Sequence, residues 1–180
     1  MDAMNEMLSR AADRTIGVVR GIGDDRFGLP TPCTEYDVRA LLGHLSWVAA
    51  MMAALARKEQ VPPQDTEPAA LEGRVRDMVA AWADPAAFEG ESPMMGLPMT
   101  VVFQMGLGDL VFHGWDLARA TGQDYEVDTE TAEATLAYIE QMAPMARQNG
   151  VIGEEVAVPA DAPPFERALG LSGRDPAWKP

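Results

Sequence analysis

The chain holds two histidines, and the residues around them place both inside the protein. His44 and His113 each fall on the apolar line of a different predicted helix. A single inward histidine usually hydrogen-bonds a backbone carbonyl in the core, so neither residue indicates chemistry by itself. Asp109, however, precedes His113 by four residues, which puts its carboxylate on the same helix face, about 6 Å from the imidazole. The two imidazoles and this carboxylate are therefore candidate ligands for a metal ion.

A divalent cation would also remove the cost of burying the Asp109 carboxylate. An ionised group in an apolar interior costs several kcal/mol unless it is paired, and no Lys or Arg shares its helix face within one turn. Two histidines and a carboxylate leave one coordination position open, as in catalytic zinc and non-haem iron sites, whereas structural zinc takes four protein ligands. We expect zinc, with nickel, iron or manganese as alternatives. Cys33 lies about three helical turns before His44 along the chain, so we do not expect it to be a ligand.

Asp116 follows His113 by three residues and precedes Arg119 by three, which leaves three roles open. Its carboxylate could orient the His113 imidazole, act as a fourth ligand, or pair with Arg119 at the surface. We favour the first of these roles. Trp47 and Trp115 lie near the two histidines and could form aromatic walls of a cleft, although tryptophan is more common in a core.

Small and flexible residues accompany these candidates. Glycine in a helix interior costs about 0.5 to 1 kcal/mol relative to alanine, so we expect either tight helix packing or room for a ligand at Gly106, Gly108 and Gly114. The twelve methionines are expected mainly to fill the core, with a soft pocket wall for an apolar or sulfur-bearing substrate as the alternative. The irregular segment 84–98 is expected to be a site wall or lid rather than an inert linker.

Five long amphipathic segments are predicted to position these residues. Apolar residues recur at helical spacing in each of them, and glycine, proline or capping residues mark their ends. We expect helices over residues 4–19, 34–57, 69–82, 100–121 and 128–149, with a short helical stretch at 165–169. Strand signals are confined to short pieces, so the predicted class is all-α. We expect a single domain over residues 1–180, a four-helix bundle with an added short helical C-terminal segment.

The composition limits where the protein works and what it binds. With 47% hydrophobic residues, a chain of 180 residues can build one core. A formal charge of −14 would repel phosphate backbones and anionic headgroups, so we expect neither nucleic acid nor a membrane as partner. The longest apolar run, residues 45–56, is shorter than the roughly 20 residues that span a bilayer. One cysteine and a start unlike a signal peptide favour the cytoplasm.

Three stretches of the sequence resemble a known family. They are TPCTEYDVRALLGHL at 31–45, HGWDLARATG at 113–122 and LGLSGRDP at 169–176. The chain is similar to actinobacterial metal-binding proteins related to the N-terminal domain of mycothiol-dependent maleylpyruvate isomerase, in the DinB-like metalloenzyme superfamily. The resemblance implies an up-down-down-up four-helix bundle. It also implies a divalent metal held by a histidine of the second helix and a carboxylate-x-x-x-histidine pair of a later one, here His44, Asp109 and His113. The isomerase has glutamate where this chain has Asp109.

Two classes of function follow from the residues and the resemblance. The first is an enzyme, a metal-dependent thiol S-transferase or isomerase, because enzymes of this kind use the metal to activate a low-molecular-weight thiol such as mycothiol. Its partners would be that thiol and a small electrophile. The second is a non-catalytic metal-binding bundle with a structural or stress-related partner role. A metal-free bundle, in which both histidines find other partners, is a third interpretation. We further expect a homodimer, since apolar helix faces would remain exposed and symmetric dimers are common.

Overall fold

Six α-helices and three short 3₁₀ turns form the regular structure of the computed structural model, which describes residues 2–65 and 68–180. The α-helices are α1 (Asp2–Arg20), α2 (Val38–Ala56), α3 (Leu71–Trp82), α4 (Met99–Ala120), α5 (Thr129–Gln148) and α6 (Pro164–Leu171). The 3₁₀ turns are η1 (Asp24–Arg26), η2 (Pro68–Ala70) and η3 (Pro85–Phe88). Within the two described ranges, β pairing is limited to isolated bridges, Pro30 with Asp37 and Glu91 with Pro98. The predicted all-α class is confirmed.

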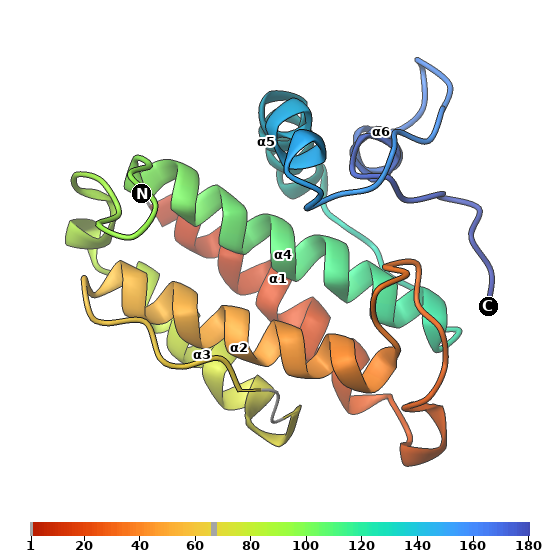
Figure 1. Cartoon of the computed structure of the whole chain (residues 1–180), viewed down its shortest axis with the longest axis horizontal. Helices are drawn as coiled ribbons and strands as arrows, with labels where there is room; N and C mark the ends of the chain where they lie inside the picture. Colours follow the sequence, from red (N-terminus) through yellow and green to blue (C-terminus); the bar gives the residue numbers. More distant parts are fainter. Residues whose placement is uncertain (1, 66–67) are drawn as a thin grey trace.

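Helices α1 to α4 form a four-helix bundle (Figure 1). Figure 1 shows α1 and α4 running in one direction and α2 and α3 in the other. The connection between α2 and α3 returns along the bundle, which allows these two consecutive helices to run parallel. This is the up-down-down-up order that the family resemblance implies.

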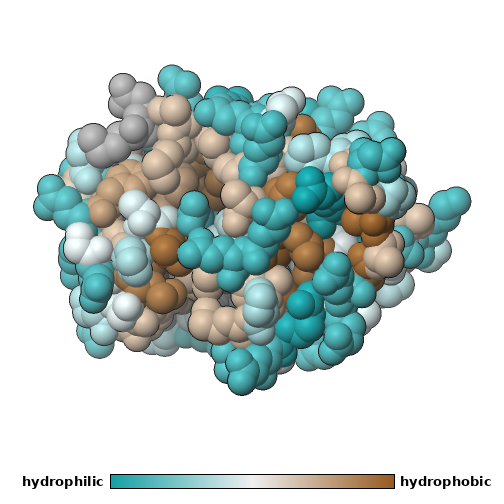
Figure 2. Space-filling view, turned by 90° about the horizontal axis from the view of Figure 1, so that it is seen from above, coloured by the Kyte–Doolittle hydropathy of each residue, from teal (hydrophilic) through white to brown (hydrophobic). Residues whose placement is uncertain are grey.

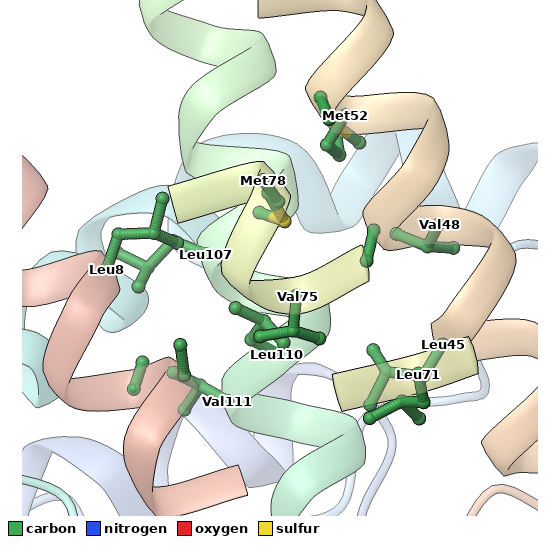
Figure 3. Packing of buried hydrophobic residues seen from close by; sticks show 14 of the residues in the cluster. Leu8, Leu45, Val48, Met52, Leu71, Val75, Met78, Leu107, Leu110 and Val111 are labelled. Carbon is green, nitrogen blue, oxygen red and sulfur yellow. The ribbon is translucent and has the colours of Figure 1, made fainter. Parts of the chain in front are cut away.

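One apolar core fills the space between these four helices (Figure 3). Every helix of the bundle contributes buried side chains: Leu8 of α1, Leu45, Val48 and Met52 of α2, Leu71, Val75 and Met78 of α3, and Leu107, Leu110 and Val111 of α4. Full burial of one such side chain stabilises a fold by about 1.5–3 kcal/mol. Because α2 and α4 share this core, their relative position, and that of any side chains they present to each other, is fixed by packing.

Glycine lets α4 approach its neighbours closely at two points. A Cβ on Gly106 would lie 2.8 Å from Met78 Cε, and one on Gly114 would lie 2.5 Å from both Thr15 Oγ1 and Tyr125 Oη. Separations this short do not occur between real atoms of these types, so alanine does not fit at either position without a shift. Both glycines serve tight packing, which is one of the two roles expected from the sequence.

Helices α5 and α6 add a second layer over α4 (Figure 1). A smaller apolar cluster joins the three helices and consists of Phe112, Trp115, Leu136, Ile139, Ala143, Ala168 and Leu169. The face seen from above in Figure 2 is mixed, with teal hydrophilic residues around tan to brown hydrophobic ones. The C-terminal part of the chain is thus packed against the bundle rather than separate from it.

Helix α2 begins at Val38, four residues later than predicted. The preceding loop has hydrogen bonds of its own, among them one of 2.7 Å from the Thr31 hydroxyl to the backbone oxygen of Tyr36. The Asp37 carboxylate then caps the helix by accepting from the backbone N–H of Ala40 at 2.8 Å. The predicted start was wrong because these loop contacts outcompete an earlier helical turn.

The same helix is long and apolar enough to meet the limits for a membrane span. In this structure, however, 72% of the qualifying stretch is buried inside the bundle, as in the core helix of a soluble protein. The four-helix core therefore accounts for the apolar character of α2.

Candidate metal centre

Two helices bring the three predicted ligands to one place. His44 lies about two turns into α2, and Asp109 and His113 lie one turn apart on α4. The ligand atoms of the three residues lie within 4.8 Å of one another. His113 Nε2 is 3.8 Å from Asp109 Oδ1, and the two imidazole rings stand nearly perpendicular with centroids 5.1 Å apart. The structure thus makes neighbours of the three side chains that the sequence suggested as ligands.

The donor set and its spacing suit a divalent cation. In a tetrahedral zinc site with bonds of about 2.0–2.2 Å, two ligand atoms lie about 3.3–3.6 Å apart. The 3.8 Å between Asp109 and His113 is slightly longer than this, and the spacings of up to 4.8 Å would shorten to it by side-chain rotation. Two imidazoles and one carboxylate also match the ligands of catalytic sites that keep a position open. These residues therefore fit a metal ion.

The surroundings of Asp109 disfavour its own negative charge. Although 33% of the side chain remains exposed, the helices around the carboxyl group remove most of its water, and this burial raises its pKa in spite of nearby His113 and Arg174. At 3.8 Å, His113 is too far away to hydrogen-bond the carboxylate. A cation at the site would supply the missing positive charge and favour the ionised form of Asp109.

The surroundings of His44 keep its imidazole neutral. Burial, together with the neighbouring His113, lowers the pKa of His44 to about 4. The Tyr36 ring stacks on the imidazole with centroids 5.0 Å apart, and its hydroxyl oxygen lies 3.5 Å from Nδ1. A neutral imidazole has a free lone pair for a metal ion, so His44 can act as a ligand at neutral pH without first losing a proton.

A buried ion pair lies behind His113. Asp116, whose side chain is fully buried one turn further along α4, is hydrogen-bonded through Oδ2 to His113 Nδ1 at 3.0 Å. Arg174, from the turn after α6, donates to both oxygens of Asp116, from Nε at 2.9 Å and from Nη2 at 2.7 Å. When Nδ1 of neutral His113 donates to Asp116, its proton stays on that side and Nε2, which faces Asp109, is left as the ligand atom.

The contacts of Asp116 bear on the three roles foreseen for it. Burial alone would raise the pKa of Asp116, but Arg174 and His113 outweigh burial and lower it, so the carboxylate is ionised. Arg119 points elsewhere and donates to the backbone oxygen of Trp178 at 3.0 Å. The Asp116 carboxylate is thus hydrogen-bonded to the imidazole, and its cationic partner is Arg174 rather than Arg119; its role in orienting a metal ligand stays a prediction.

The sequence does not predict that two further residues, Arg174 and Cys33, lie at the site. Arg174 carries no signal beyond its place in a family motif, because local spacing does not reveal that a turn 58 residues after Asp116 returns to it. Cys33 was not expected to be a ligand because of its distance from His44 along the chain, and the structure nevertheless places it beside the site. Its sulfur lies within 4.8 Å of ligand atoms of His113 and Asp116, and burial raises the pKa of the thiol.

The three predicted ligands line a cleft of about 670 Å³ bounded by α2, α4 and α5. Trp47 forms part of its wall, as expected, whereas Trp115 is buried in the cluster beneath α5 and α6. The expectation that segment 84–98 forms a wall was wrong for this cleft, because its Phe88 packs against Trp82 in the bundle, with ring centroids 5.2 Å apart. Residues 149–152, which follow α5, border the cleft instead.

The N-terminal half of the chain matches a known protein family. Residues 8–94 match the mycothiol maleylpyruvate isomerase N-terminal domain. This is the family that the sequence motifs resemble, and the match covers 87 of the 180 residues. The matched segment includes His44, whereas Asp109, His113, Asp116 and Arg174 lie beyond its end. The match to the mycothiol maleylpyruvate isomerase N-terminal domain, together with the cluster of ligand atoms, indicates a mycothiol-related, DinB-like metal-binding function.

Similarity to two curated proteins extends over almost the whole chain. They come from Mycobacterium tuberculosis, strains CDC 1551 / Oshkosh and ATCC 25618 / H37Rv, and both carry the name "Uncharacterized protein". Each is 28% identical to this chain over 180 residues, which covers 92% of this chain and 94% of the relative. No solved structure matches the chain.

Proposed function

We propose that this protein is a metal-dependent enzyme that activates a low-molecular-weight thiol, of the mycothiol type, for transfer to a small electrophile or for isomerisation. The observation that supports the proposal is the position of His44, Asp109 and His113, three ligands of a catalytic type on the wall of an open cleft. A closed site inside the core would have no room for a substrate. The family match to residues 8–94 supports mycothiol as the first thiol to test.

A divalent cation bound there would lower the pKa of a thiol and so supply a sulfur nucleophile at neutral pH. His44 and His113 would hold it through neutral nitrogens, and Asp109 would contribute the negative charge. Asp116, held in place by Arg174, would keep the proton of His113 on Nδ1 and leave Nε2 free for the ion. In transfer, the thiol loses its proton to solvent, a sulfur–carbon bond forms, and the leaving group departs with its electron pair. In isomerisation, the thiol adds to a double bond and is later eliminated, so that it is regenerated.

A non-catalytic metal-binding bundle is the second candidate, and one observation favours it. The sulfur of Cys33 lies within 4.8 Å of ligand atoms of His113 and Asp116, so a metal ion held by these three residues would have a thiolate among its protein ligands, as in structural zinc. Cobalt substitution separates the two candidates, because a thiolate ligand adds an intense charge-transfer band. A band that disappears in Cys33→Ser would favour the closed, structural site.

The decisive variant for the enzyme is Asp109→Asn, which keeps the side-chain volume and removes the only anionic ligand. We expect about one equivalent of divalent metal per wild-type chain, weaker metal binding in the variant, and loss of thiol-dependent activity with the helical fold retained. Asp161→Asn, which changes an exposed loop carboxylate, is the matched control. Metal analysis, thermal melts and thiol-consumption rates with and without chelator provide the measurements. Equal rates in wild type and Asp109→Asn would exclude metal-activated thiol chemistry at this site.

A further inference from the structure

The wall of the cleft around the candidate metal centre is largely apolar. Side chains from three helices form it: Trp47, Val48 and Met51 of α2, Met105 and Phe112 of α4, and Ile139, Met142 and Met145 of α5. Four of these are methionines, whose flexible thioethers adapt to molecules of different shape. The volume of about 670 Å³ lies within the range of small-molecule sites. We call the four residues Met51, Met105, Met142 and Met145 the methionine wall. A pocket wall was the alternative to core packing that the sequence left open for the methionines.

The lining offers no free cation to an acidic molecule. Its charged side chains, among the residues that the structure describes, are Glu35, Asp109 and Arg174. The guanidinium of Arg174 already donates to both oxygens of Asp116 and to the Ser172 hydroxyl, so its charge is neutralised within the protein. What remains on the wall is negative.

A bound divalent cation does not change this balance enough to attract an anion. Its two positive charges are matched by the carboxylates of Glu35 and Asp109, and a thiol that has lost its proton adds one more negative charge. The whole chain carries a formal charge of −14, which also repels anions approaching from solution. A carboxylate on the second substrate would therefore enter an apolar, negatively charged cleft without a partner, and burial of an unpaired charge is costly.

We infer that the molecule accepted by this cleft beside the thiol is an uncharged, predominantly apolar electrophile, such as an activated aryl halide or an α,β-unsaturated ketone, and not a dicarboxylate. The inference rests on the proposed function for its chemistry, but the preference for an uncharged molecule is a property of the cleft and can be measured without turnover.

A pair of fluorescent probes tests the preference directly. N-Phenyl-1-naphthylamine and 8-anilinonaphthalene-1-sulfonate share one ring system and differ by a sulfonate group. We expect the neutral probe to bind the wild-type protein at least tenfold more tightly, both with and without bound zinc. Tighter or equal binding of the sulfonate would overturn the inference.

Three variants show whether binding occurs in this cleft. Met142→Asp should weaken binding of the neutral probe at least fivefold, whereas Met94→Asp, at an exposed methionine outside the cleft lining, should leave it unchanged. Glu35→Lys should improve sulfonate binding several-fold and leave the neutral probe unaffected. Equal effects of the two aspartate variants would show that the probe binds elsewhere and would overturn the inference.

A kinetic arm separates failure of the inference from failure of the proposed function. Zinc-loaded protein and mycothiol are incubated with 1-chloro-2,4-dinitrobenzene or with its anionic analogue 4-chloro-3,5-dinitrobenzoate, in both of which sulfur replaces chloride on the ring. Faster consumption of the neutral compound supports the inference, and faster consumption of the benzoate overturns it. If neither compound reacts while the neutral probe still binds preferentially, the inference on the cleft stands and the proposed thiol chemistry fails.

Discussion

Loss of the Arg174 guanidinium would strand a negative charge inside the protein. The side chain of Asp116 has no exposed surface and that of Arg174 is 9% exposed, so water replaces little of the lost pairing. Removal of one partner from a buried ion pair costs about 3–5 kcal/mol of stability. Since 1 kcal/mol shifts the Tm of a domain of this size by about 2–4 °C, we expect Arg174→Met to lower the Tm by about 6–20 °C.

A double variant and a surface control make this prediction specific. Arg174→Met combined with Asp116→Leu should regain much of the lost stability, because it buries no unpaired charge. Arg57→Met removes a 2.6 Å pair with Asp77 at the surface and should change stability by no more than about 1 kcal/mol. Thermal unfolding followed by circular dichroism, in the presence of chelator, measures all four proteins. A single variant no less stable than the surface control, or a double variant less stable than the single one, would refute the reasoning.

The same variant should also weaken metal binding. Without Arg174, the Asp116 carboxylate loses the two hydrogen bonds that hold it in place, so it no longer fixes the orientation of the His113 imidazole. Mutation of a residue that hydrogen-bonds a metal-binding imidazole typically lowers metal affinity by about 10–100-fold. Competition with a chromophoric chelator measures the change. An unaltered affinity would show that Arg174 supports the fold alone.

Two further predictions concern packing and pH. Gly114→Ala should destabilise the protein by about 1–3 kcal/mol, because its Cβ would lie 2.5 Å from Thr15 and Tyr125, whereas Gly73→Ala in α3 has open space and should be neutral or stabilising in denaturant unfolding. In metal-free protein, stability should fall as the pH drops from about 6.5 to about 4, because unfolded His44 binds a proton that the folded protein does not. His44→Gln should flatten this dependence in urea unfolding, and an unchanged slope would contradict it.

Helix geometry explains why much of the site could be predicted from the sequence. The four-residue spacing of Asp109 and His113 fixes their shared face on any helix, whatever surrounds it. His44 lies on an apolar helix that has to face the core, and α2 and α4 meet within that core. Helical periodicity in the sequence therefore predicts both the helices and the three candidate ligands.

The remaining residues of the site depend on where irregular segments return. Cys33 reaches His113 because a loop, held by the hydroxyl of Thr31, folds beside the start of α2. Arg174 reaches Asp116 because the chain reverses after α6. Neither change of chain direction leaves a periodic pattern in the sequence: one depends on a local hydrogen bond of Thr31, and the other brings Arg174 to a residue 58 positions earlier. The same lack of a periodic signal explains why segment 84–98 was assigned to the wrong surface.

The methionine wall makes the cleft sensitive to oxidation. Oxidation converts the thioether of methionine to a sulfoxide, which is polar and larger. Met145 is 47% exposed and Met51 is 7% exposed, so oxidants reach the rim of the wall well before its deepest part. The cleft would then lose its affinity for apolar molecules gradually, from the rim inward, while the bundle stays folded. Because reductases reverse methionine sulfoxide, such damage is repairable, and the oxidation state of Met145 would reflect the balance between oxidation and repair.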